Sequence, residues 1–396
     1  MIYVVKSGDT LQKISGETGV SVQKIAADNQ LKYRDRLAPG QALLLRGTDG
    51  DKEQGMGAGF LTGGYAYPFI DPPVLEEALP ALDEVLVFSY GFTFAGDLVP
   101  PRQEERWMLE RAQSMGVRPW MVLTPFSSEG AFNNQLIRAL VENSGMQERL
   151  IGQILSGMKE KGYRGLDIDF EYILPGNREQ YAQFVGKVKE KLGPEGFPVT
   201  AAAAPKTSGQ QKGILVEGVD YALLAEHADA VFLMTYEWGY TYGPPMAVAP
   251  LDKVREVVEY ALTQMPPEKI LLGIPNYGYD WTLPYERGIT RAKTIGNEEA
   301  VEIAVENGVS IEYASVSESP WFTYRKNGME HVVWFEDVRS IRAKWNLVRE
   351  YGLSGARYWN LMRPFRANWL LIGPAKRGQG WKIPCRSPWK ARAEWM

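Results

Sequence analysis

The chain has 396 residues and a formal net charge of −4, with one cysteine and two histidines. These counts exclude a disulfide within the chain and a zinc site of the usual Cys/His ligand number, and the charge disfavours nucleic acid as a partner. No apolar run reaches the roughly 18 residues of a membrane span. If the chain is an enzyme, we expect its acid–base chemistry to rest on carboxylates, helped by Tyr or Lys, with no metal and no other cofactor.

Residues 1–47 have the pattern of a compact βααβ unit. Residues 2–5 and 42–45 are short strand-like segments. Between them, Asp9 or Thr10 can cap a first helix that Gly19 would end, and Ser21 can cap a second. The N-terminal sequence lacks the apolar stretch of a signal peptide, so we expect no export by the usual secretory route.

This unit resembles a LysM module. The residues that carry the resemblance are YVVKSGDTL at 3–11, Ile25, Asn29, Leu31, and Leu37-x-Pro39-Gly40-Gln41-x-Leu43. The resemblance implies binding to a polymer that contains N-acetylglucosamine, such as peptidoglycan or chitin. A small packing domain without a ligand is the alternative.

Residues 48–59 are rich in Gly and charge and have no apolar period, which predicts a flexible linker. A flexible linker would let the small module hold a wall polymer while the larger body works nearby, so that the effective substrate concentration rises.

Residues 60–373 alternate apolar strand-like runs with amphipathic helical stretches, which predicts an α/β fold. The predicted strands are 60–67, 84–90, 118–124, 165–171, 199–204, 230–236, 270–277 and 355–359. Eight such repeats favour a (β/α)₈ TIM barrel, with an α+β insertion at about 280–333, after strand 7. A doubly wound open sheet is the alternative, but no G-x-G-x-x-G turn follows the first strand.

Residues 374–396 form a basic, tryptophan-containing extension. We expect it to pack across the bottom of the barrel; contact with an anionic polymer or another protein is the alternative. Cys385 lies in this tail.

Three carboxylates alternate along predicted strand 4, at Asp167, Asp169 and Glu171. Alternate strand residues share a face, so all three should point into the barrel while Leu166 and Ile168 point to the helices. Confined carboxylates repel one another and lose hydration, which raises at least one pKa and favours shared protons. Glu171 ends the row at the carboxyl end of the strand, where TIM-barrel active sites lie.

The D-x-D-x-E pattern resembles the signature of glycoside hydrolase family 18. That family uses a substrate-assisted mechanism in which the substrate's acetamido oxygen is the nucleophile. The resemblance implies that Glu171 is the general acid and then the base. It also implies that Asp169 binds the acetamido N–H and that Asp167 shares a proton with Asp169.

Other motifs are similar to those of the same family. Met234-Thr235-Tyr236-Glu237 is similar to M-x-Y-D, which implies that Tyr236 donates to the acetamido oxygen and that Glu237 contacts the sugar. Tyr277 and Trp281 match G-x-P-x-Y-G-x-x-W, with sugar contact and packing against the insertion as equal alternatives. Trp359, which ends strand 8, would be the apolar floor under the sugar.

The chain departs from the family pattern in three places: Glu237 replaces the Asp of M-x-Y-D, Arg164 stands where an acid often begins the row, and residues 123–127 lack S-x-G-G. A LysM module joined to such a barrel looks most like the peptidoglycan hydrolases of bacterial spores. We therefore expect a retaining N-acetylglucosaminidase of cortex peptidoglycan, associated with the spore coat, cortex or cell wall. A chitinase or chito-oligosaccharidase, and a catalytically impaired wall-binding protein of the spore coat, are the alternatives. His227 and His331 are interpreted as structural.

Overall fold

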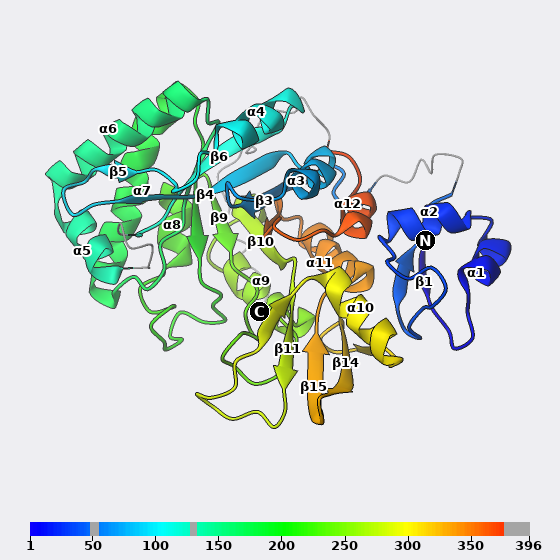
Figure 1. Cartoon of the computed structure of the whole chain (residues 1–396). Helices are drawn as coiled ribbons and strands as arrows, with labels where there is room; N and C mark the ends of the chain where they lie inside the picture. Colours follow the sequence, from blue (N-terminus) through cyan, green and yellow to red (C-terminus); the bar gives the residue numbers. More distant parts are fainter. Residues whose placement is uncertain (48–54, 127–132, 376–396) are drawn as a thin grey trace, which may run out of the picture.

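The computed structural model describes residues 1–47, 55–126 and 133–375. Figure 1 shows a small N-terminal module on one side, a barrel wrapped by helices, and a β-rich insertion below the barrel. The 376–396 part of the predicted tail and the 48–54 part of the predicted linker lie outside the described residues.

The N-terminal module has the predicted βααβ order. Its elements are β1 (Ile2–Val4), α1 (Leu11–Thr18), α2 (Val22–Asp28) and β2 (Ala42–Leu44). The two strands pair antiparallel. Thr10 and Ser21 accept hydrogen bonds from backbone N–H groups in the first turns of α1 and α2, and Gly19 ends α1 at a φ of 71°.

Eight parallel strands close into a barrel within the described residues, which confirms the predicted fold. They are β3 (Leu61–Ala66), β4 (Glu84–Phe92), β6 (Arg118–Leu123), β7 (Leu166–Ile168), β8 (Val199–Ala203), β9 (Ala230–Leu233), β10 (Ile270–Pro275) and β16 (Gly355–Trp359). Strand β3 pairs with both β4 and β16, so the sheet has no open edge at that point. A short strand, β5 (Leu98–Val99), pairs antiparallel with β4.

Helices surround the barrel. They are α3 (Pro72–Ala78), α4 (Arg106–Ser114), α5 (Asn134–Glu142), α6 (Ser144–Lys161), α7 (Arg178–Leu192), α8 (Tyr221–His227), α9 (Leu251–Leu262), α11 (Val338–Glu350) and α12 (Arg366–Ile372). The outward side of the fourth barrel strand, β7, and of the residues after it packs against these helices. The ring centroid of Phe170 lies 5.6 Å from that of Tyr181 and 6.0 Å from that of Phe184, both on α7. The core therefore lies between the strands and the helices, and the barrel interior is left for other side chains.

The insertion between β10 and α11 is an antiparallel sheet with one helix. Its elements are β11 (Gly278–Thr282), β12 (Lys293–Ile295), α10 (Asn297–Asn307), β13 (Glu312–Ala314), β14 (Ser319–Lys326) and β15 (Met329–Trp334). His331 lies within β15, and its Nδ1 is 2.9 Å from Oδ1 of Asp280. That contact joins two strands of the insertion.

The N-terminal module packs against the barrel and the insertion. Figure 1 places it beside α12 and α10. The N–H of Ile311 donates to the carbonyl of Pro39 (2.8 Å), and Nη2 of Arg339 donates to the carbonyl of Gly40 (3.1 Å). Leu44 belongs to the same buried apolar cluster as the barrel core, and Ala38 belongs to the cluster of the insertion.

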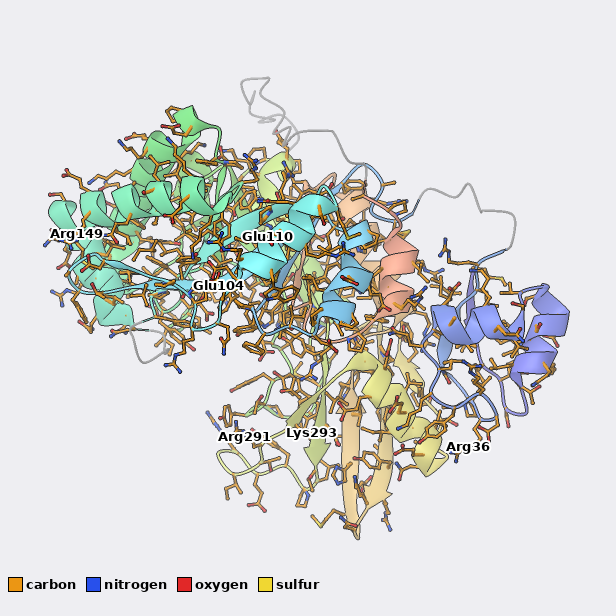
Figure 2. The ribbon with its side chains drawn as sticks, turned by 45° about the horizontal axis from the view of Figure 1, so that its top comes forward. Arg36, Glu104, Glu110, Arg149, Arg291 and Lys293 are labelled. Atoms are coloured by element: carbon orange, nitrogen blue, oxygen red, sulfur yellow. The ribbon has the colours of Figure 1, made fainter. Side chains whose placement is uncertain are left out.

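Charged groups extend this contact. The ammonium of Lys32 lies 3.1 Å from Glu302, and the Tyr33 hydroxyl donates to Glu306 (2.6 Å), both on α10. Figure 2 shows Arg36 where the module borders the insertion, and its guanidinium lies 4.6 Å from the Tyr33 ring centroid. The module is therefore docked on the larger body through α10 and the insertion.

The described end of the predicted linker is bonded to the barrel. The N–H groups of Met56 and Gly57 donate to the carbonyls of Leu371 and Ile372 at the end of α12. Arg349 of α11 donates to the carbonyls of Gly55 and Met56. Residues 55–57 thus belong to the larger body, and their Gly content reflects close packing rather than flexibility.

A pair of glycines in the N-terminal module tests whether its docking depends on one close approach. Gly40 (φ +84°) and Gly8 (φ +80°) both have left-handed backbones, but a Cβ on Gly40 would lie 1.8 Å from the carbonyl oxygen of Ile311, whereas one on Gly8 would meet nothing within 4 Å. Both alanine variants should lose about 1–2 kcal/mol of module stability. Only Gly40→Ala should separate the module from the insertion.

Small-angle scattering and limited proteolysis within 48–59 would measure that separation. We expect a larger maximum dimension and faster cleavage for Gly40→Ala than for Gly8→Ala. Equal scattering and equal cleavage of the two variants would mean that the approach of Gly40 to Ile311 does not hold the module in place.

Candidate active site

An open cleft lies at the carboxyl ends of the barrel strands and encloses about 620 Å³. This is the face on which TIM-barrel enzymes place their reacting groups. The cleft is lined by Tyr67, Phe88, Phe126, Asp169, Glu171, Tyr172, Ala204, Pro205, Ile214, Leu215, Met234, Tyr236, Glu237, Tyr240 and Trp359.

The three carboxylates on β7 and just after it lie at three depths along the inward side of the barrel. Asp167 is fully buried within β7, Asp169 is 5% exposed, and Glu171 is half-buried in the cleft. The ladder of β7 ends at Ile168, so Asp169 and Glu171 follow the strand and do not belong to it, although the N–H of Asp169 still donates to the carbonyl of Leu123. The row therefore leads from the closed interior to the open cleft.

Asp167 is held by donors on three other strands. Tyr65 of β3 donates its hydroxyl to Oδ2 (2.8 Å), Arg357 of β16 donates to Oδ1 (2.9 Å), and Thr200 of β8 donates to Oδ1 as well. Both oxygens of Asp167 are thus fixed by hydrogen bonds, and one of the three donors is a cation. This geometry does not fit the expected proton sharing between Asp167 and Asp169, because both oxygens of Asp167 are already occupied by donors.

Asp169 has the opposite surroundings. Its Oδ1 has no hydrogen-bond partner among the described residues. Burial, and then the charges of Glu171 and Asp167, raise the pKa of its carboxyl well above the usual range. Burial therefore favours the protonated form of the Asp169 carboxyl, and its Oδ1 is available to accept a hydrogen bond from a ligand.

Glu171 is poised to exchange a proton near neutrality. Burial raises the pKa of its carboxyl to about 7, and the charge of Glu237 acts in the same direction. The next residue, Tyr172, has a φ of 60°, a left-handed conformation that non-glycine residues seldom adopt. A carboxyl with a pKa near the working pH is suited to give and then take a proton.

Glu237 lies at the mouth of the cleft and is oriented by two tyrosines. The hydroxyls of Tyr277 and Tyr279 (2.9 Å for the latter) both donate to its Oε1. Loss of hydration raises the pKa of Glu237, while these two hydrogen bonds lower it. Tyr277 is buried and holds Glu237 in place; it does not line the cleft, so the expected direct sugar contact of Tyr277 is not what the geometry supports.

Trp281 is fully buried, and its indole N–H donates to the carbonyl of Gly243 (2.9 Å). It faces the core beside the insertion because β11 turns away from the barrel into the inserted sheet. The expectation that Trp281 contacts a sugar is therefore wrong, and the packing alternative is the correct one.

Tyr236 and Trp359 line the cleft as expected. Burial, and then the charges of Asp169 and Glu171, raise the pKa of the Tyr236 phenol, which therefore remains a hydroxyl donor. The ring of Trp359 packs edge-on against Phe88 (4.9 Å) and Tyr65 (5.5 Å), which leaves its other surface to the cleft. The two side chains supply a hydrogen-bond donor and an apolar wall beside the carboxylates.

Several residues of the site were not predicted. Arg357 and Thr200 hold Asp167, and Tyr279 helps to hold Glu237. Arg357 stands two residues before Trp359 on β16, and alternate residues of a strand share a face, so Arg357 points inward as Trp359 does. That spacing was the signal that could have revealed it.

Within the described ranges, no group of three or more His, Cys, Asp and Glu side chains is arranged to hold a metal ion. In the same part of the chain, no helix is both long and apolar enough to cross a membrane.

Comparisons with known proteins identify two families that match this chain. A family model described as glycosyl hydrolases family 18 matches residues 129–363, and a LysM domain model matches residues 3–46. The chain is 41% identical over 299 residues to the cortical fragment-lytic enzyme of Bacillus subtilis (strain 168), over 75% of this chain and 68% of that protein.

Two further relatives match nearly the whole chain. The cortical fragment-lytic enzyme of Bacillus anthracis is 35% identical over 421 residues, which cover 94% of this chain and 97% of that protein. The crystal structure of the Bacillus cereus spore cortex-lytic enzyme SleL superposes with a TM-score of 0.87 at 31% identity, over 94% of this chain and 96% of that one.

The charge of Glu237 should be visible in the titration of Glu171. Glu237→Gln removes a negative neighbour, so the pKa of Glu171 should fall below about 7, yet stay above its usual range because burial is the larger cause. Carboxyl ¹³C NMR titration measures it without substrate. Glu148→Gln, an exposed change of equal charge, is the control. Identical titrations of the two variants would contradict the electrostatic coupling.

Proposed function

Because the chain belongs to glycoside hydrolase family 18, we propose that it cleaves β-1,4 bonds at N-acetylglucosamine in the peptidoglycan of the spore cortex. The observation that carries this proposal is the placement of Glu171, with a pKa of about 7, in an open cleft that Asp169, whose pKa burial also raises, lines as well. The names of the relatives support the choice of cortex over other substrates.

The proposed mechanism is retaining and substrate-assisted. The acetamido oxygen of the substrate attacks the anomeric carbon while the bond to the leaving oxygen breaks, and Glu171 gives its proton to that oxygen. A water molecule then attacks the oxazolinium ion and gives its proton to the Glu171 carboxylate. This route fits a site whose acid and base are one carboxyl with a pKa near neutrality.

The other groups of the cleft position the substrate in this proposal. Oδ1 of Asp169 accepts the acetamido N–H, and its free lone pairs support that role. The hydroxyl of Tyr236 donates to the acetamido oxygen and keeps it aimed at the anomeric carbon. Trp359 lies under the sugar ring, and Glu237, fixed by its two tyrosines, binds a sugar hydroxyl.

We further propose that the N-terminal LysM module binds the same polymer and that the protein works in the spore coat, cortex or cell wall. The match of the LysM family model and the cortex-lytic names of the relatives support this placement. A soluble fragment without N-acetylglucosamine would then be neither bound nor cut.

Digestion of purified spore peptidoglycan, followed by mass analysis of the fragments, tests the proposal. Wild-type protein should release fragments with a reducing N-acetylglucosamine end. Glu171→Gln should lower turnover by at least about 100-fold, because general acid–base catalysis contributes about 10²–10⁴-fold. Binding to insoluble peptidoglycan should be unchanged.

Glu148→Gln is the matched control for that experiment, since it makes the same chemical change on the exposed surface. It should digest at the wild-type rate. Wild-type turnover by Glu171→Gln would contradict the mechanism. Faster cleavage of chitin oligomers than of cortex fragments would identify a chitinase instead.

A further inference from the structure

Arg357 places a positive charge inside the barrel, directly below the cleft. The residue is fully buried at the middle of β16. In the sheet it pairs with Gly63 of β3, and Gly63 pairs with Glu84 of β4. A Cβ on Gly63 would lie 3.1 Å from Cγ of Arg357, so the glycine leaves room for the long side chain to cross the interior.

The guanidinium is fixed by partners on three strands. Its Nη1 donates to Oδ1 of Asp167 and to Oγ1 of Thr200 (2.9 Å each), and its Nη2 donates to Oε2 of Glu84 (3.0 Å). Its other side lies 4.7 Å from a ring centroid of Trp120. Asp167, Glu84 and Arg357 have no exposed side-chain surface, so these contacts are not screened by water.

The two aspartates of the row therefore have unequal surroundings. Asp167 accepts three hydrogen bonds, and one of its donors is the Arg357 guanidinium, with which it forms an ion pair. Asp169 is buried, touches no described cation and keeps one oxygen without a partner. When two neighbouring carboxyls hold one proton, the proton belongs on the one that has no cation.

We propose that Arg357 is a positioning residue that fixes the negative charge of the row on Asp167 and thereby keeps the row's proton on Asp169, next to Glu171. This inference rests on the proposed hydrolase function for its catalytic consequence. The location of the proton can be tested without any substrate.

Groups that face the row from other elements add no second positive charge; besides those named next, the phenols of Tyr67 and of Tyr181 on α7 lie in the field of Asp169. Facing the row are Tyr65 of β3, Thr200 of β8, and Tyr236 and Glu237 after β9. The phenols and the hydroxyl are neutral, and Glu237 is negative or neutral. Arg357 therefore supplies the positive charge that the row contacts, and its position under Asp167 selects the deepest carboxyl.

The arrangement has a consequence for the first chemical step. As Glu171 gives its proton to the leaving oxygen, a negative charge forms on Glu171. A neutral Asp169 can donate a hydrogen bond to that new charge, whereas an ionised Asp169 would repel it. Fixing the charge on Asp167 thus favours the transition state and leaves substrate binding little changed.

Infrared difference spectroscopy in a Glu171→Gln background locates the proton. With Arg357 present, Asp169→Asn should remove the C=O band of one buried carboxylic acid, and Asp167→Asn should leave that band in place. In an Arg357→Met background, the band should survive Asp169→Asn, because Asp167 has lost its cation and takes the proton. Loss of the band on Asp167→Asn, and not on Asp169→Asn, with Arg357 present would overturn the proposal.

Turnover on cortex fragments supplies the second readout. Arg357→Met should lower kcat by about 100-fold with little change in KM, as for the loss of one preorganised electrostatic group. Arg357→Lys should recover part of that loss, since it keeps the charge. In an Asp167→Asn background, Arg357→Met should have no further effect on kcat; independent, multiplying effects would overturn the proposal.

A matched control separates charge placement from stability. Lys344 and Glu336 form another ion pair without exposed surface (2.7 Å), away from the row. Lys344→Met should lower the unfolding temperature and leave kcat of the folded protein unchanged. If Arg357→Met does not fold, the double variant Arg357→Met with Glu84→Gln removes the buried Glu84 charge, which would otherwise keep Arg118 alone as its cation. The infrared band and kcat of that double variant then test the proposal. Wild-type kcat in folded Arg357→Met, or in the folded double variant with Glu84→Gln, would overturn the proposal.

Discussion

The cost of burying charge inside a closed barrel is the constraint on which the site depends. An ion moved from water into a protein interior loses several kcal/mol unless a partner lies at the right distance. Here the partners of Arg357 come from β4 and β7, and strand register brings Glu84 and Asp167 to 3.0 and 2.9 Å of it. Arg357, Glu84 and Asp167 thus pair with one another deep in the barrel. Asp169 and Glu171, nearer the cleft, are buried and repel each other without a described cation in contact.

In the upper half of the site, the pKa values of the carboxyls depend on loss of hydration, and the positions of the side chains depend on backbone geometry instead of ion pairs. Aromatic rings wall the cleft beside Trp359, and burial is the first cause of the raised pKa values of Asp169 and Glu171. Tyr172 and Glu237 both have left-handed backbones, at φ values of 60° and 68°. Left-handed backbones of non-glycine residues cost free energy and persist only where the surrounding structure holds them. The packing of the barrel therefore offsets the cost of these two conformations in the cleft.

Local patterns predicted the barrel and the carboxylate row because both are written in short segments. A period of two places Asp167, Asp169 and Glu171 on one face whatever surrounds them. The partners of that row could not be found in the same way: Arg357 lies 190 residues from Asp167, and Tyr65 lies 102 residues away. The same limit explains Trp281, since motif spacing brings it near the cleft but does not reveal that β11 turns into the inserted sheet.

The N-terminal module changes the physical meaning of the linker. A flexible tether raises effective concentration because the tethered site searches a volume. The backbone of the module bonds to the insertion at Pro39 and to α11 at Gly40, and its side chains pair with α10. A module held in this way searches no volume while it stays docked. Its orientation to the cleft is then set by the fold. If both surfaces hold one polymer, as proposed, the flexibility needed to reach both must come from the glycan strand, and the spacing of the two sites selects the strand segments that can be cut.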